Sequence, residues 1–260
     1  MISAISRLGA LFINLVYDSI ETIGMVGELG LDSLRRSHQV FRNLDLTIKQ
    51  MIAMGVTSIP LVVITSLFTG AVSVWQAEYQ FANIIPDRYL GTAVCKAIVI
   101  ELGPVLTSLV VAGRVGTAIA AELGTMTVTE QIDAMASLAL NPVRFLVLPR
   151  FLAGLIMLPI LTIFSDFLAI LGSWVVAVIF LGVPAHVYTN GLKLFFNTSD
   201  VIAGLIKSFV FGGIIALMGC YHGLRTSGGA EGVGQATMKS VVASAVLILI
   251  FDFIIAFLLF

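Results

Sequence analysis

The sequence predicts an all-α integral membrane protein with about five membrane-spanning helices, an N-terminal amphipathic helix and one short cytoplasmic helix. Hydrophobic residues make up 58% of the 260 residues and charged residues only 11%, whereas soluble domains carry about 25% charged residues. The mean hydropathy is +1.06. The apolar residues are gathered into tracts that reach the length of about 20 residues that a bilayer crossing requires. The net charge of −1 argues against nucleic acid as a partner.

Five apolar tracts are expected to cross the membrane. The first carries no charge between Gln50 and Ala77, and the third contains only Asp166. The third tract is long enough for one long helix or two short ones, so six spans remain the alternative. The predicted tracts are residues 50–77, 89–123, 151–183, 201–224 and 240–260.

Residues 1–48 are predicted to form an N-terminal region that precedes a transmembrane domain of residues 49–260. In the first helix Leu8, Phe12 and Leu15 fall on one side and Arg7 and Asp18 on the other. Such a helix lies in the membrane interface instead of crossing it. A cleaved signal peptide is the alternative, but the stretch has no A-x-A-like cleavage site.

Lysine and arginine are distributed unevenly between the two sides that five spans define. The positive-inside rule therefore predicts a cytoplasmic N-terminus, an outer C-terminus and a cytoplasmic connection between the second and third spans. The residues assigned to the cytoplasmic side are Arg7, Arg35, Arg36, Arg42, Lys49, Arg114, Arg144, Arg150, Arg225 and Lys239, and those assigned to the outer side are Arg88, Lys96 and Lys193.

Small residues recur every four positions along the second span. This spacing lets helix backbones approach closely, which is a main source of helix association in lipid. The rows indicate either a packing face within the chain or an interface between subunits. The first row is Ser108, Ala112, Gly116, Ala120 and Gly124, and the second is Gly113, Thr117, Ala121 and Thr125.

Four ionisable residues interrupt the apolar tracts: Glu101, Asp166, Lys207 and Asp252. Charges at membrane depth are costly and normally face a partner or a watery cavity, so Lys207 is expected to be neutralised by Glu101 or Asp252. Each charge has either a packing role or a transport role. In the segment ELGP, Pro104 removes a backbone donor, and a helix kink is expected there. The scattered cysteines and histidines indicate no metal site.

Residues 127–142, TVTEQIDAMASLALNP, differ from the apolar segments around them. Thr127 and Glu130 match a T-x-x-E capping box, and Asn141-Pro142 is expected to end the helix. The pattern predicts a helix over residues 128–140, about 20 Å long. This helix is either an ordinary surface helix or a rigid contact for a cytoplasmic partner. The contact residues would be Glu130, Ile132, Asp133 and Met135, with Val128 and Ala139 on the same apolar face as Ile132 and Met135.

Large side chains follow one another at helical spacing along the first span. The pattern alone favours a lipid-facing or core stripe, and the alternative is the wall of a cavity for an apolar ligand. In the second interpretation Val62 points away from the cavity. The lining residues would be Phe68, Val72, Trp75, Gln76 and Tyr79 of the first span with Phe253 and Phe257 of the fifth.

Several long motifs together resemble the MlaE-type permeases, which are membrane subunits of MCE-associated ABC lipid transporters. The most specific is ELGPVLTSLVVAGRVGTAIAAELGTMTVTEQIDAM, and NPVRFLVLPRFLAG, GLIKSFVFG, GCYHGLRTSGGAEGVGQAT and FDF follow in the same order. The resemblance covers residues 46–260. One position departs from the family pattern, because Ile100 stands where an arginine commonly precedes the glutamate of ELGP. Lys96 lies about 140° around the helix from Glu101 and is a poor substitute.

The resemblance implies a homodimeric permease in a bacterial inner membrane that binds no cofactor itself. It implies two MlaF-like ABC ATPase subunits that bind ATP and Mg²⁺, a periplasmic hexamer of MlaD-like MCE-domain protein, and room for a cytoplasmic STAS-domain subunit. The implied substrate is phospholipid or a related lipid, and the implied role is to maintain outer-membrane lipid asymmetry. Residues 128–140 would be the coupling helix, and Glu101, Lys207 and Asp252 the family's intramembrane charges.

Two other functions remain open from the residues alone. A proton-coupled secondary transporter could use the intramembrane charges as a relay, and a structural anchor could simply hold an MCE protein. The chain contains no GxxxxGK[ST] nucleotide motif, which fits all three functions.

Overall fold

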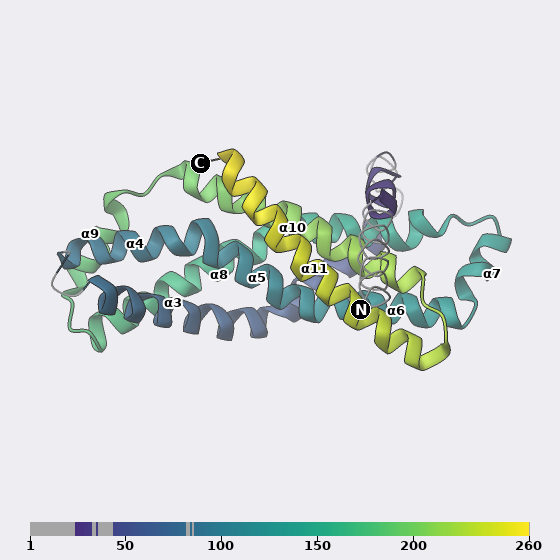
Figure 1. Cartoon of the computed structure of the whole chain (residues 1–260), viewed down its shortest axis with the longest axis horizontal. Coiled ribbons are helices and arrows are strands. Elements are labelled where there is room, and N and C mark those ends of the chain that lie inside the picture. Colours follow the sequence, from purple (N-terminus) through teal and green to yellow (C-terminus); the bar gives the residue numbers. More distant parts are fainter. Residues whose placement is uncertain (1–23, 33–34, 36–43, 82–83, 85, 260) are drawn as a thin grey trace, which may run out of the picture.

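The computed structural model describes residues 24–32, 35, 44–81, 84 and 86–259. Within these residues every regular element is helical. The helices form an elongated bundle with α7 (Gln131–Ser137) at one end of the long axis and α9 (Ala185–Leu194) at the other (Figure 1). The predicted amphipathic helix at residues 1–23 lies outside the described residues.

Five helical stretches in the described residues are long and apolar enough to span a membrane: Leu44–Phe81, Asp87–Val128, Val143–Ile179, Thr198–Leu224 and Gly229–Leu259. The third contains one continuous helix despite Pro159, so the six-span alternative is wrong. The helices of the spans are α2 (Leu44–Met54) and α3 (Ile59–Phe81), then α4 (Leu90–Ala97), α5 (Gly103–Val111) and α6 (Thr117–Val128), then α8 (Leu148–Ile179), α10 (Thr198–Leu224) and α11 (Gly229–Leu259).

Prolines account for two of the π-helical segments in the spans. The segments Ile98–Leu102 and Val143–Val147 each end two residues before a proline, Pro104 and Pro149. A proline has no N–H, so the carbonyl four residues earlier loses its donor and the turn widens locally. The irregularity expected at Pro104 therefore takes the form of a π-helical segment.

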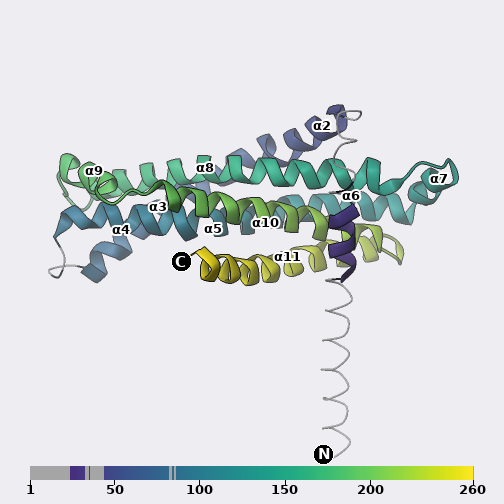
Figure 2. The ribbon, with the colours of Figure 1, turned by 90° about the horizontal axis from the view of Figure 1, so that it is seen from above.

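Glycines set the closest helix crossings. Gly154 of α8 and Gly212 of α10 face each other so closely that a Cβ on either would collide with the carbonyl oxygen of the other. Gly70 of α3 meets the backbone of Ala169 in α8 in the same way. These contacts tie α3, α8 and α10 into one layered unit, in which α8 and α10 run side by side with α11 on the outside (Figure 2).

The two rows of small residues on the second span have different environments. The first row, from Ser108 to Gly124, is buried within the chain, with Gly116 near Ser240 of α11 and Gly124 against Thr226. This row is therefore a packing face within the chain. The second row, from Gly113 to Thr125, is half-buried or exposed.

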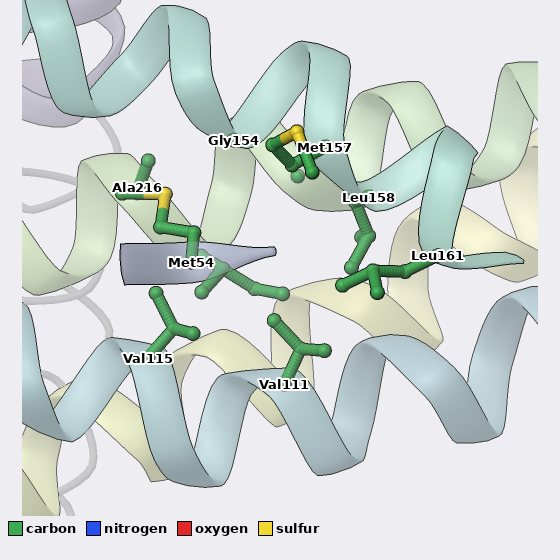
Figure 3. Close-up of a pocket in the computed structure, with 10 residues that line it drawn as sticks. Met54, Val111, Val115, Gly154, Met157, Leu158, Leu161 and Ala216 are labelled. Carbon is green, nitrogen blue, oxygen red and sulfur yellow. The ribbon is translucent and has the colours of Figure 1, made fainter. Parts of the chain in front are cut away.

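The interior between α2, α5, α8 and α10 is closely packed. Figure 3 shows Met54, Val111, Val115 and Leu158 pointing toward one another around a small pocket. Its volume is about 10 Å³, which holds at most a single water molecule. A lipid chain does not fit into this part of the core.

Candidate functional site

A cluster of three charges joins the second, fourth and fifth spans. Lys207 of α10 is completely buried, and its Nζ donates a hydrogen bond of 2.6 Å to Oε1 of Glu101. The same Nζ lies 2.8 Å from Oδ1 of Asp252 in α11. The sequence suggested Glu101 or Asp252 as the partner of Lys207, and the structure pairs it with both.

The fold explains how these charges meet. Glu101 lies in the π-helical segment Ile98–Leu102, where the widened turn directs it toward α10. Asp252 continues the inward-facing row of α11 at four-residue spacing from Ser240, Ser244 and Ile248, which are buried. The cluster thus lies where the buried face of α11 meets the body of the bundle.

The other intramembrane charges lie apart from this cluster. Oδ1 of Asp166 packs against Gly103, where it occupies the space that a Cβ would need. Lys96 forms an ion pair of 3.2 Å with Asp200 near the α9 end. Glu101 is therefore neutralised by Lys207, while Lys96 serves another carboxylate. Sequence reasoning missed Asp200, which lies in the first turn of α10.

The predicted capping box at Thr127 and Glu130 is wrong. Helix α6 continues through Val128, and the Thr127 hydroxyl donates to the carbonyls of Leu123 and Gly223. Glu130 adopts a left-handed conformation with φ of 60°, and α7 begins only at Gln131. The helix is thus residues 131–137 instead of 128–140, because Thr127 lies inside α6, where its hydroxyl donates to carbonyls instead of accepting from the first amides of a new helix.

The end of α7 also differs from the prediction. Ala139 is left-handed with φ of 57°, the Leu140 amide donates to Met135 and the Ala139 amide to Ala136. These bonds form a Schellman motif, which terminates the helix before Asn141. The Asn141 side chain accepts hydrogen bonds from the amides of Val143 and Arg144 and so caps the next span. Asn141-Pro142 is therefore a start signal, not a stop signal.

Helix α7 projects from the end of the bundle (Figures 1 and 2). Ile132 and Met135 are half-buried within this chain, whereas Glu130 and Asp133 are exposed. Leu138, which the sequence reasoning did not select, is 73% exposed at the C-terminal end of α7. This end of the molecule therefore carries an exposed apolar side chain and exposed acidic residues.

The aromatic row of the first span faces outward along α3. Phe68, Val72, Trp75, Gln76 and Tyr79 are all exposed, as are Phe253 and Phe257 of α11, whose rings stack at 6.4 Å. Val62, expected to point outward, is completely buried, so the outward face of α3 is the aromatic row itself. In the described part of the chain α3 packs mainly on α8 and α11 mainly on α10 and α6, so the two rows lie on helices whose main partners differ.

Comparison with known proteins assigns the family. The family model Permease MlaE matches residues 47–258. A probable ABC transporter permease protein of Rickettsia typhi is 41% identical over 217 residues, 84% of each chain. One from Synechocystis is 42% identical over 214 residues, 82% of this chain and 81% of the relative. The chloroplastic protein TRIGALACTOSYLDIACYLGLYCEROL 1 of Arabidopsis thaliana is 36% identical over 210 residues, 81% of this chain and 60% of the relative. The chain belongs to the MlaE permease family and is an ABC transporter permease, with five helices in its described residues that are long and apolar enough to span a membrane.

Proposed function

We propose that this chain is the permease subunit of an ABC transporter that moves phospholipid or a related lipid between a bacterial inner membrane and a periplasmic MCE-domain protein. The observation that carries the proposal is the outward aromatic row of α3, in which large side chains stay exposed while the chain's interior is packed. One relative is named after a galactolipid, which is consistent with a lipid as substrate. Lipid transfer of this kind would maintain outer-membrane asymmetry.

The proposed active form is a homodimer. The aromatic rows of α3 and α11 lie on surfaces that one chain leaves uncovered. On a membrane-spanning helix such exposed apolar side chains face either the surrounding lipid or another helix. A second copy would complete a central cavity whose walls carry Phe68, Val72, Trp75, Gln76, Tyr79, Phe253 and Phe257.

The two ends of the bundle would receive different partners. Arg144 lies in the π-helical segment that follows α7 and Arg150 in the first turn of α8, while Arg225 ends α10 and Lys239 lies in α11. From the positive-inside rule we infer that the α7 end is cytoplasmic. A separate MlaF-like ATPase, which binds ATP and Mg²⁺, would contact α7 through Glu130, Ile132, Asp133, Met135 and Leu138. The MlaD-like MCE hexamer would lie over the α9 end, and a STAS-domain subunit would bind on the cytoplasmic side.

The function is tested by reconstituting the permease with its ATPase and MCE protein in liposomes that carry a fluorescent phospholipid. Lipid transfer to the MCE protein should require ATP and should stop when the catalytic carboxylate of the ATPase is removed. Lipid transfer that depends on a proton gradient instead would support the secondary transporter. An assembly that binds the MCE protein but moves no lipid under either condition would support the structural anchor.

A further inference from the structure

An ion pair that the proposed lipid site does not use connects the two helices on either side of α7. Nη2 of Arg150 lies 2.7 Å from Oε2 of Glu122. Glu122 lies on α6, which leads into the α7 connection, and Arg150 lies in the first turn of α8, which leads out of it. The Arg150 side chain is 3% exposed and the Glu122 side chain 56%.

Arg150 also contacts the π-helical segment that starts the third span. Its Nη1 donates a hydrogen bond of 2.7 Å to the carbonyl of Leu146, within Val143–Val147. One guanidinium thus joins α6, the π-helical segment and α8. Arginine suits this position because its planar fork directs several donors in fixed directions, whereas lysine offers a single point charge.

The end of α6 is attached on another side as well. The Thr127 hydroxyl donates to the carbonyl of Gly223 in α10 at 3.1 Å. Beyond this attachment the residues of α7 are all half-buried or exposed. The chain is therefore attached to the bundle at Thr127, and within a few residues it projects from the bundle as α7.

We propose that Glu122 and Arg150 are positioning residues that make the two arms of the α7 connection, the end of α6 and the start of α8, move together. The inference rests on the proposed function, in which an ATPase displaces α7. With the pair in place, a displacement of α7 moves α6 and the start of α8 as one unit, and so reaches the second and third spans. Without it, the arms separate and the displacement is lost within the connection.

The experiment uses the full permease assembled with its ATPase in liposomes. Glu122→Gln removes the charge with almost no change in shape. Arg150→Lys keeps a positive charge, but a lysine cannot bind the Glu122 carboxylate and the Leu146 carbonyl with two separate nitrogens, as the guanidinium does. The matched control is Asp200→Asn, which removes a carboxylate from the ion pair with Lys96 near the opposite end. A nitroxide at the exposed position Ala134→Cys reports the mobility of α7, since Cys95 and Cys220 are buried.

Glu122→Gln should lower the lipid moved per ATP hydrolysed by about fivefold, the upper end of what an ion pair with one exposed partner supports. The ATPase should remain bound and active, and the nitroxide should become more mobile. Arg150→Lys should give an intermediate effect, and Asp200→Asn should leave the nitroxide mobility unchanged.

Unchanged lipid movement per ATP in Glu122→Gln would overturn the inference, even if the protein became less stable, because the pair would then serve stability alone. An equal increase in nitroxide mobility in Asp200→Asn would also overturn it. If the unmodified permease moves no lipid and binds no ATPase, the proposed function fails. The nitroxide still decides about the pair in that case, since unchanged mobility in Glu122→Gln means that it does not hold the two arms.

Discussion

Lys207 donates a hydrogen bond of 2.6 Å to Glu101 although the two residues are 106 positions apart in the chain. The bond joins the π-helical segment of the second span to the centre of the fourth. Asp252 adds a second negative charge at 2.8 Å, so α11 is attached to the bundle through the same ammonium group. The pairing accounts for three intramembrane charges without a proton relay.

Replacing Lys207 should destabilise the permease strongly. Lys207→Ala leaves two carboxylates beside each other without their cation, and the cost of about 3 kcal/mol for breaking a buried pair is an upper bound because the Glu101 and Asp252 side chains are 42% and 20% exposed. Glu101→Gln should cost less, because its side chain is 42% exposed and Asp252 still pairs with Lys207. Unfolding of the purified protein in detergent measures both effects.

A double-mutant cycle separates the two partners. Lys207→Ala combined with Glu101→Gln, and Lys207→Ala combined with Asp252→Asn, should each be milder than the sum of the single changes by about 0.5–3 kcal/mol. Strict additivity for both combinations would argue against the pairing.

The glycine crossing between α8 and α10 should tolerate no side chain. Gly212→Ala places a Cβ against the carbonyl oxygen of Gly154, which is backbone and cannot move aside cheaply. Overpacking of this kind costs about 1–3 kcal/mol. Thermal unfolding in detergent should show the loss.

Gly113→Ala is the matched control within the second span. A Cβ at Gly113 would enter open space among the described residues, so this change should leave the monomer as stable or raise its stability by about 0.5–1 kcal/mol. Equal destabilisation by both changes would contradict the role of the crossing, because the added methyl group would then cost as much in open space as against the Gly154 carbonyl.

The spans could be predicted from the sequence, whereas the ends of α7 could not. An apolar tract of about 20 residues matches the thickness of the bilayer, so hydropathy predicts the spans. An unpaired lysine in hydrocarbon is energetically costly, so Lys207 was expected to have a carboxylate partner. At Thr127, by contrast, the motif suggests a helix start, but α6 continues through this residue and packs on α10, where the Thr127 hydroxyl donates to the Gly223 carbonyl of a helix almost 100 positions away. No local pattern contains that neighbour.

The same limit explains which site residues were missed. Two ion pairs join different helices: Arg150 with Glu122, and Lys96 with Asp200. A single sequence does not tell which helices are neighbours, so these pairs could not be predicted. Leu138 was missed for a local reason: the predicted helix ran to Leu140, whereas the left-handed Ala139 ends it and leaves Leu138 exposed.

The exposed end of α7 should contribute to ATPase binding without supporting the permease fold. Burying one large apolar side chain at an interface is worth about 1.5–3 kcal/mol, so Leu138→Asp should weaken the complex at least about tenfold. Met135→Asp should weaken it too but should also lower permease stability, because Met135 is half-buried in the chain itself. Titration of labelled ATPase onto the permease in nanodiscs measures the affinity.

Leu194→Asp is the control for this experiment, since Leu194 is exposed at the α9 end. It should leave ATPase affinity unchanged. Normal ATPase binding and turnover in an Ile132→Asp, Met135→Asp double variant would reject the assignment of α7 as the coupling element and leave it an ordinary surface helix.

The aromatic row of α3 should contact the lipid during transport. A photoreactive phenylalanine analogue at Val72 or Trp75 should crosslink the fluorescent lipid, with labelling that changes when ATP is added. Phe167 of α8 is the appropriate comparison, because it is as exposed as this row and belongs to a different span.

A position that only faces the surrounding bilayer meets the same lipid with or without ATP, because bulk lipid exchanges freely. Val72 and Trp75 should therefore respond to ATP while Phe167 does not. Equal, ATP-independent labelling at all three positions would mean that the row simply faces the membrane, and that the lipid route lies elsewhere.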